Sequence, residues 1–303
     1  MNILLNRIPV DGPWGGGNLL VRAFCDNMSN LGHNIFHDFS KESDIIMLQD
    51  PRPGNTGISI NDALKYKHEN PDVKIIQRIN ECDARKNTTG VDQMLQECSK
   101  LIDATIFVSE WMKNYHLEKG WQCKLNTVIH NGVDLEHFKE NKKNRNGKVN
   151  IVTHHWSDNI MKGFDIYEKL DEFVKHNDEY TFTYIGRHRN TFKNTNIVQP
   201  LFGQDLGKEL SKYDVYVSAS RFDPGPNHIL ESIACNLPTY VHKDGGGCIE
   251  FSGDDHVFDD YDALEKILMG KDFKHNEFKV SSWEKCIAQF DKFLNEVKNN
   301  EHS

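Results

Sequence analysis

The order of apolar runs along the chain restricts its fold more than any other feature of the sequence. Short runs rich in Ile and Val recur through the 303 residues, with longer amphipathic stretches between them. Strands that alternate with helices at this rhythm are typical of parallel sheets covered by helices on both faces. We predict strands at residues 2–6, 44–48, 73–79, 104–108, 126–129, 149–153, 180–186, 214–220 and 238–242.

The stretches between these runs have helical spacing. Apolar residues follow steps of three or four at Leu20, Phe24, Met28 and Leu31, and again from Phe164 to Phe173. A third row of this kind lies near the end of the sequence and consists of Trp283, Ile287, Phe290, Leu294 and Val297. An apolar face of this kind has to pack against another element.

Length and one polar segment predict two domains. A chain of 303 residues is comfortable for two domains of about 150 residues each. The segment Lys139–Lys148 is polar almost throughout and separates two α/β blocks of similar size. We therefore place one domain at residues 1–140 and a second at residues 145–280.

Charge and cysteine usage narrow the function classes. The 36 Lys and Arg residues against 45 Asp and Glu residues give a net charge of −9, which argues against non-specific nucleic-acid binding. No Lys/Arg-rich amphipathic helix is evident, so we expect at most weak membrane association. The seven cysteines are scattered, as is typical of free thiols in a reducing compartment. Together with the lack of a basic leader or a long apolar stretch, this predicts a cytoplasmic protein.

Two carboxylates stand eight residues apart in the segment Arg221–Gly247. Asp223 follows a predicted strand, and Glu231 lies on the helix after a Pro-Gly-Pro break, where Pro226 suits the first turn. Both then lie at a helix start on the C-terminal edge of a parallel sheet, where open α/β folds bind ligands. The alternative is an aspartate that interacts with the helix dipole and a solvated glutamate.

Glycines and cations occupy other junctions between a strand and a helix. Gly15–Gly17 would let a phosphate approach backbone N–H groups at a helix start, although the same glycines also suit a plain turn. Lys162 and Gly163 stand at a later loop-to-helix start, and Arg187 directly follows the predicted strand at residues 180–186. Both side chains would offer a cation to a phosphate.

Two short motifs are typical of metal sites, but neither predicts a metal site in this chain. His154 and His155 are adjacent, but no third ligand follows at a spacing that zinc sites use. Asp260-Tyr261-Asp262 opens an apparent helix, and capping is the favoured role of its first aspartate. We predict no metal and no bound cofactor.

Taken in order, these segments resemble the retaining glycosyltransferases of family 4, which have the two-domain GT-B fold. The resemblance covers nearly the whole chain and rests on the glycine loop followed by LGHNI, on FVSEWMKNY, on VIHNGVDLEHF, on KGFD and on residues 214–251. Its most specific part is Asp223 to Glu231, which looks like the family's Glu-x7-Glu donor segment with an aspartate in first place. The resemblance implies two Rossmann-like domains with parallel sheets facing across a cleft, and a C-terminal helix, residues 281–300, that crosses back to the N-terminal domain.

The resemblance also implies an activity. A sugar would move from a UDP- or GDP-linked donor to a hydroxyl of a glycan, lipid-linked or small-molecule acceptor, with retention and without a required metal. Asp223 would face the donor sugar and Lys162 the diphosphate as the catalytic residues, and Glu231 would accept hydrogen bonds from the ribose. The remaining donor-side residues would be Gly16, Gly17, Arg187, Gly225, Pro226 and Asn227.

The chain departs from the family at three points. Ser157 stands where an arginine usually precedes Lys162, and Arg187 is a candidate replacement. The loop at residues 78–86 has no histidine, so Asn80, Glu81 or Asp83 would serve on the acceptor or sugar side. Asp223 itself is one methylene shorter than the usual glutamate. A non-catalytic nucleotide-sugar or glycan-binding protein, or an epimerase or phosphorylase on the same fold, is therefore an open alternative.

Overall fold

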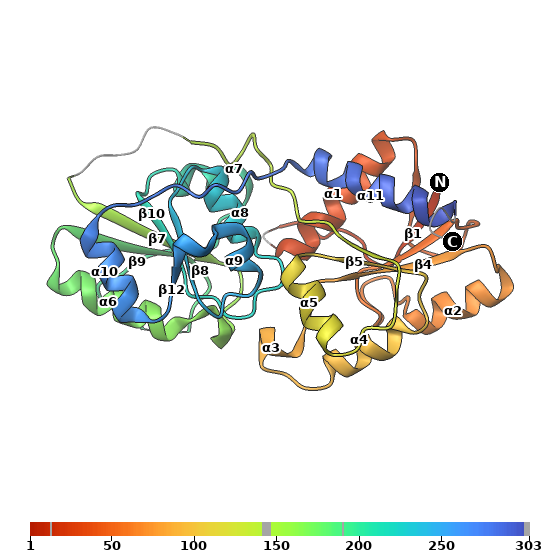
Figure 1. Ribbon diagram of the computed structural model, residues 1–303. Helices are drawn as coiled ribbons and strands as arrows, with labels where there is room; N and C mark the ends of the chain where they lie inside the picture. Colours follow the sequence, from red (N-terminus) through yellow and green to blue (C-terminus); the bar gives the residue numbers. More distant parts are fainter. Residues whose placement is uncertain (13, 141–146, 190, 300–303) are drawn as a thin grey trace. The chain divides into compact units, whose positions relative to one another are not determined.

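The computed structural model describes residues 1–12, 14–140, 147–189 and 191–299, which form two units that each contain a six-stranded parallel sheet (Figure 1). The first unit consists of Met1–Asp83, Thr88–Gly132 and Trp283–Ser303, and the second of Ala84–Asn87 and Val133–Ser282. The division falls after Gly132, ahead of the polar segment Lys139–Lys148, most of which lies outside the described residues.

The sheet of the first unit has the strand order β2 (Asn34–Phe36), β1 (Asn2–Leu5), β3 (Ile45–Leu48), β4 (Lys74–Ile79), β5 (Ala104–Phe107), β6 (Asn126–Val128). Its helices are α1 (Gly16–Asn30), α2 (Ile60–Glu69), α4 (Val91–Ser99), α5 (Glu110–Glu118) and α11 (Trp283–Lys298). The short helix α3 (Asp83–Lys86) begins at the last residue of the segment Met1–Asp83, and its other residues group with the second unit. Side chains alternate between the two faces of a strand. Accordingly, Ile3 and Leu5 pack into the core that contains α1 and α11, and Leu4 packs into the core that contains α2.

The sheet of the second unit has the strand order β12 (Val257–Phe258), β11 (Thr239–His242), β10 (Val215–Ser218), β7 (Val149–His155), β8 (Tyr180–Gly186), β9 (Asn196–Val198). Its helices are α6 (Phe164–His176), α7 (Gly203–Leu210), α8 (Asn227–Ala234), α9 (Gly247–Ser252) and α10 (Tyr261–Gly270), with 3₁₀ turns at η1 (Ile160–Lys162) and η2 (Asp254–His256). One core lies between the sheet, α6 and α10, and another between the sheet, α7, α8 and α9.

The parallel α/β fold predicted from the sequence is confirmed, and each of the nine predicted strands corresponds to a strand of the structure. The structure adds β2, β9 and β12, which have only two or three residues each and therefore too few positions to show a pattern. Leu31 corrects one expectation, because it lies past the end of α1 and is exposed rather than part of the buried row.

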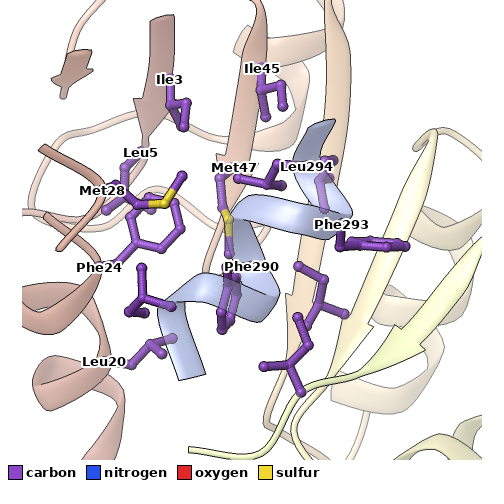
Figure 2. Close-up of a cluster of buried hydrophobic side chains, with 14 of the residues drawn as sticks. Ile3, Leu5, Leu20, Phe24, Met28, Ile45, Met47, Phe290, Phe293 and Leu294 are labelled. Carbon is purple, nitrogen blue, oxygen red and sulfur yellow. The ribbon is translucent and has the colours of Figure 1, made fainter. Parts of the chain in front are cut away.

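Helix α11 packs against α1 in the first unit, so the expected return of the last helix is confirmed. Its buried face contributes Ile287, Phe290, Leu294 and Val297 to a core cluster. Figure 2 shows Phe290 and Leu294 in this cluster together with Phe24 of α1. Phe290 meets Phe24 of α1 edge to face, with ring centroids 5.7 Å apart and an interplanar angle of 81°. Aromatic pairs favour this geometry, so α11 is an integral part of this core.

Two further observations concern the chain as a whole. No helix in the described part of the chain has the length and apolar character that crossing a membrane requires. All seven cysteines are unpaired, and six of them are buried.

We expect Phe290→Ala to lower the free energy of unfolding by about 3–5 kcal/mol, because it removes a fully buried ring and leaves a cavity between α1 and α11. Urea denaturation would measure the change. Lys292→Ala on the same helix is the control, since the Lys292 side chain is 81% exposed and its loss should alter stability by no more than about 0.5 kcal/mol. Equal stability of the two variants would contradict this account of α11.

Candidate functional site

Asp223 lies in the loop after β10, and its backbone is hydrogen-bonded to a second run of glycines, Gly245–Gly247. Asp223 donates its backbone N–H to the carbonyl of Gly245 at 3.2 Å, and its own carbonyl accepts from the N–H of Gly247 at 2.8 Å. Gly246 has φ +65°, and a Cβ there would lie 3.0 Å from the Asp223 nitrogen. Glycine is required for this close approach, so residues 245–247 fix the backbone from which the Asp223 carboxylate projects.

A short turn after β7 positions Lys162 at the end of η1. The side chain of Asn159 caps the turn by accepting from the backbone N–H of Met161 at 2.9 Å. Gly163 follows with φ +80°, and a Cβ there would stand 2.1 Å from the carbonyl oxygen of Ala219. The Lys-Gly pair of the sequence is thus explained by packing, because only glycine lets the turn approach the end of β10 so closely.

Lys162 and Asp223 form a buried ion pair. The Lys162 Nζ donates to Asp223 Oδ2 at 2.7 Å, and the two side chains are 14% and 6% exposed. Burial by itself raises the pKa of the Asp223 carboxyl, but the charge of Lys162, followed by that of Arg85, outweighs burial and holds this pKa below its ordinary value. Asp223 is therefore a carboxylate under ordinary conditions.

Arg85 is a charged neighbour that the sequence did not indicate. It lies in the segment Ala84–Asn87, which groups with the second unit, and its charge acts on both Asp223 and His228. In the sequence, Arg85 is distinguished only by its place in the loop at residues 78–86, which lacks the family's histidine.

Glu231 lies on α8, and it is buried rather than solvated. The helix begins at Asn227 with Pro226 as its N-cap. The Glu231 Oε2 lies 2.8 Å from His154 Nε2, and the two side chains are 10% and 9% exposed. In the sequence, no third ligand followed His154 and His155 at a zinc-site spacing. In the structure, the His154 imidazole has the carboxylate of Glu231 on α8 as its partner.

Two more imidazoles lie next to the ion pair. The His155 and His228 rings are 4.9 Å apart, with His155 Nε2 2.7 Å from the Tyr167 hydroxyl and His228 Nε2 2.9 Å from Ser218 Oγ. Burial, together with the nearby charge of Lys162, lowers the pKa of both histidines well below the ordinary value. Both rings are neutral near pH 7, so the positive charges that act on Asp223 are those of Lys162 and Arg85.

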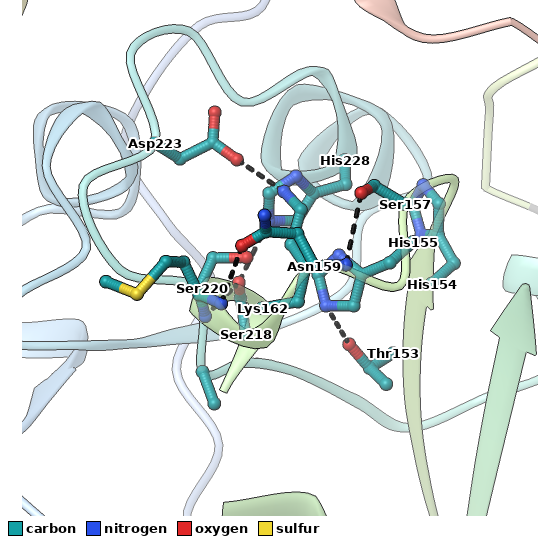
Figure 3. Close-up of polar contacts among 12 residues, drawn as sticks. Thr153, His154, His155, Ser157, Asn159, Lys162, Ser218, Ser220, Asp223 and His228 are labelled. Atoms are coloured by element: carbon teal, nitrogen blue, oxygen red, sulfur yellow. Dashed lines mark hydrogen bonds and ion pairs between the residues drawn. The ribbon is translucent and has the colours of Figure 1, made fainter. Parts of the chain in front are cut away.

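Figure 3 shows these groups converging from separate segments, with Lys162 directed toward the Asp223 carboxylate and His228 close to both. Lys162 lies in the segment after β7 and Asp223 in the segment after β10, and these two strands are neighbours in the sheet. The carboxyl ends of parallel strands meet at one edge of the sheet, so the fold itself assembles the site. Among the described residues, no group of three His, Cys, Asp or Glu side chains could hold a metal ion.

Arg187, the candidate replacement for the family's arginine, directly follows β8. Its guanidinium stands 4.0 Å from the ring centroid of Trp156, and its backbone N–H donates to the carbonyl of His155 at 3.3 Å. Trp156 directly precedes Ser157, the residue found in place of the expected arginine. The stacking keeps the exposed Arg187 cation beside that position.

The first unit brings two of its candidates together. Helix α1 begins at Gly16, with Gly15 as an N-cap that has no side-chain hydrogen bond. A Cβ on Gly17 would lie 3.6 Å from the Asn80 amide nitrogen, so the glycine loop and Asn80 are neighbours.

The third candidate, Asp83, has a structural role. Its carboxylate accepts from the backbone N–H groups of Val91 and Asp92 at 3.1 and 3.0 Å, in the first turn of α4. Glu81 stands two residues before Asp83, and the Glu81 carbonyl oxygen lies 3.1 Å from His116 Nε2.

The D-x-D motif also acts as a cap. The Asp260 side chain accepts from the backbone N–H of Ala263 at 3.0 Å and caps α10, which is the role that the sequence favoured.

Comparison with known proteins identifies the fold. No family model and no curated protein sequence matches the chain. Sucrose-phosphate synthase from Thermosynechococcus elongatus matches with a TM-score of 0.71 at 12% identity, covering 98% of each chain. Anabaena HepE, solved with UDP and glucose, matches with a TM-score of 0.68 at 12% identity, covering 100% of this chain and 99% of HepE. The pneumococcal O-GlcNAc transferase GtfA, solved with UDP and GlcNAc, reaches 0.58 at 14% identity over 84% of this chain and 56% of GtfA. At such identities the likeness concerns the fold, and the GT-B prediction is confirmed.

The ion pair predicts a pH dependence of stability. Because the pKa of Asp223 is lower in the folded protein than in the unfolded chain, Asp223 stabilises the fold above the unfolded value of about 3.9. This contribution should decrease as the pH falls from about 5 through 4 and below. Urea denaturation at pH 6, 5, 4 and 3 should show the stability difference between wild type and Asp223→Asn shrinking toward low pH.

Asp259→Asn is the control for this series, since the Asp259 side chain is 74% exposed. It should keep the pH dependence of the wild type. A stability difference between wild type and Asp223→Asn that is constant from pH 6 to pH 3 would contradict the assignment of a lowered pKa to Asp223.

Proposed function

We propose that this protein is a retaining glycosyltransferase that moves a sugar from a nucleotide-sugar donor to a hydroxyl group of an acceptor, without a required metal ion. The observation that carries the proposal is the buried Lys162–Asp223 pair, with Glu231 on the helix that follows, at the C-terminal edge of the second sheet. Buried charges beside a ligand-binding edge are typical of functional sites.

Lys162 would stabilise the leaving group. An ammonium has three N–H donors, and one of them is used by Asp223, so two are available for the oxygens of a diphosphate. Negative charge develops on the nucleoside diphosphate as the sugar departs, and a cation already in position lowers that barrier. Arg187, held over Trp156, would supply a second cation in place of the arginine that Ser157 replaces.

The two carboxylates would bind different parts of the donor. Asp223 is ionised, and two backbone hydrogen bonds fix its main chain, so its carboxylate would accept hydrogen bonds from hydroxyls of the transferred sugar. Glu231 has Oε2 engaged by His154 and would use Oε1 for a ribose hydroxyl. The backbone of Gly225, Pro226 and Asn227 at the start of α8, and of Gly16 and Gly17 at the start of α1, would line the sugar and diphosphate.

A UDP-linked donor is the form best supported. HepE was solved with UDP and glucose and with UDP-glucose, and GtfA with UDP and GlcNAc. The acceptor would approach the residues of the first unit that include Asn80 and Glu81. Retention would follow if the departing phosphate oxygen takes the proton of the acceptor hydroxyl on the same face of the sugar. We also propose that the protein works in the cytoplasm, where its unpaired cysteines would remain reduced.

A second candidate is a protein that binds nucleotide sugars without turning them over. The observation that favours it is the loss of the arginine at Ser157, which removes one cation from the diphosphate region. Donor hydrolysis separates the two candidates, because a glycosyltransferase slowly transfers the sugar to water and a binding protein leaves the donor intact.

The two carboxylates give a sharp test of the donor site. Glu231→Gln should weaken UDP and UDP-glucose alike, because both carry the ribose, whereas Asp223→Asn should reduce transfer and leave UDP affinity nearly unchanged. Loss of one charged hydrogen-bond partner costs about 1.5–3 kcal/mol, or roughly ten- to 150-fold. Calorimetry with UDP and kinetics with UDP-glucose measure these effects. Glu172→Gln on the exposed side of α6 is the control, and equal loss of UDP affinity in both site variants would exclude the assignment.

Lys162→Met should reduce kcat on the order of 10²–10³-fold, because it removes the cation nearest the developing diphosphate charge. The variant also leaves Asp223 buried without its partner, so stability has to be measured in parallel. The double variant Lys162→Met, Asp223→Asn should regain stability and stay inactive. Lys175→Met, at an exposed position of α6, should behave like the wild type, and a folded Lys162→Met variant with unchanged kcat would remove Lys162 from the mechanism.

A further inference from the structure

The turn after β11 supports the backbone that carries Asp223. Phe222 donates its backbone N–H to the carbonyl of Asp244 at 2.7 Å, and Asp223 donates to the carbonyl of Gly245 at 3.2 Å. Phe222 has φ +51°, in the left-handed region that residues other than glycine rarely adopt. A residue persists in this conformation only where its surroundings hold it. The shape of the chain just before the Asp223 carboxylate therefore depends on the turn at residues 242–245.

His242, the last residue of β11, fixes this turn with its ring. Its Nδ1 accepts the backbone N–H of Asp244 at 3.1 Å, and its carbonyl accepts the N–H of Gly245 at 2.8 Å. The side chain of an aspartate or asparagine makes the same contact, with the N–H two residues later, in an Asx turn. His242 is 5% exposed, and its ring meets that of Phe258 edge to face with centroids 5.6 Å apart. The ring thus has one polar task and one packing task.

The contact with Asp244 requires an unprotonated Nδ1, because a backbone N–H can only donate. In the neutral ring the proton is then on Nε2, and a second proton would go to Nδ1. The Asp244 N–H would lose its acceptor, and the Asp244 carboxylate, with Oδ2 3.6 Å from Nδ1, would accept from the protonated ring instead. Protonation of His242 therefore removes a hydrogen bond that defines the turn.

The charged groups that act on the His242 ring come from its own turn, from the loop after β10 and from the start of α6, and they are Lys243, Asp244, Arg221 and Asp165. Arg221 donates to both oxygens of Asp165, at 2.9 and 2.6 Å, and Lys243 Nζ lies 3.9 Å from Asp259. Burial, followed by the charge of Arg221, lowers the pKa of His242 below its ordinary value of 6.5. His242 is therefore neutral at pH 7 and takes up its proton in mild acid.

We propose that His242 is a positioning residue for Asp223 and that its protonation slows sugar transfer in mild acid. The inference rests on the proposed function and adds a regulation of the donor site. The neutral ring fixes the turn at residues 242–245, and the turn fixes the backbone of Asp223. Asp223 itself remains a carboxylate in mild acid, since its pKa lies below the ordinary value of 3.8.

Two substitutions separate the acceptor nitrogen of His242 from its ring. His242→Asn places an acceptor oxygen where Nδ1 lies and does not titrate, whereas His242→Phe keeps an aromatic ring against Phe258 and has no acceptor. Hydrolysis of UDP-glucose from pH 8 to pH 5 would give kcat/KM for each protein. At pH 8 we expect His242→Asn to be roughly two- to tenfold faster than His242→Phe, the effect of one hydrogen bond. Below about pH 6.5 the wild type should lose activity by a similar factor, and neither variant should show this loss.

His176→Asn is the matched control, because it makes the same exchange on α6, where the His176 side chain is 65% exposed. This variant should keep the pH profile of the wild type. The proposal is overturned if His242→Phe is at least as active as His242→Asn at pH 8, which is the result expected if the ring only fills space. It is also overturned if the wild type and His242→Asn lose activity in acid to the same extent.

Amide hydrogen exchange tests the turn without any donor. The backbone amides of Phe222 and Asp223, corrected for the intrinsic pH dependence of exchange, should lose protection between pH 7 and pH 5 in the wild type and keep it in His242→Asn. Melting temperatures at each pH would show that both proteins are folded. Protection that is constant in the wild type would overturn the proposal. If UDP-glucose is hydrolysed at no pH, the proposed function fails, and the exchange data still decide the role of His242.

Discussion

The salt bridge between Lys162 and Asp223 is the interaction on which the rest of the candidate site depends. Removing two charges from water is unfavourable, and a buried pair regains that free energy only when its geometry is good. Two glycine-dependent contacts provide this geometry, one between Gly163 and the end of β10 and one between Gly246 and Asp223. Two separate loops thus position this buried charged pair, which is a pattern typical of functional sites.

The neutral histidines around the pair have a matching role. His155 and His228 fill space beside Lys162 without adding positive charge, because burial keeps them unprotonated. A protonated imidazole there would repel the lysine and compete for the same carboxylate. His154 acts differently, since it lies against Glu231 and limits the directions in which that carboxylate can point. The polar residues of β7 and α8 thus support one arrangement of two carboxylates and one cation.

The fold and the candidate site differ in how much of each was predictable from the sequence. Nine strands of the two sheets are visible in the sequence because each is a short apolar run, whereas β2, β9 and β12 are too short to show one. Helix α11 is visible because its apolar row includes Phe290. The pairing of Lys162 with Asp223, 61 residues apart, has no local pattern and depends on two strands being neighbours in the sheet. Asp83 was a candidate for the acceptor side, but its carboxylate accepts from backbone N–H groups at the start of α4. The sequence could not separate these roles, because a carboxylate before a helix satisfies such N–H groups whether or not a ligand is present.

Helix α11 also has a consequence for the order in which the protein can fold as it is synthesised. The first unit takes part of its core from residues 1–132 and part from residues that follow the whole second unit in the sequence. During translation the apolar face of α1 that later contacts Phe290 is made long before its partner exists. The second unit, nearly continuous in sequence, can close its cores first. A nascent chain stalled before residue 283 should therefore have a protease-resistant second unit and a first unit that is still open to chaperones.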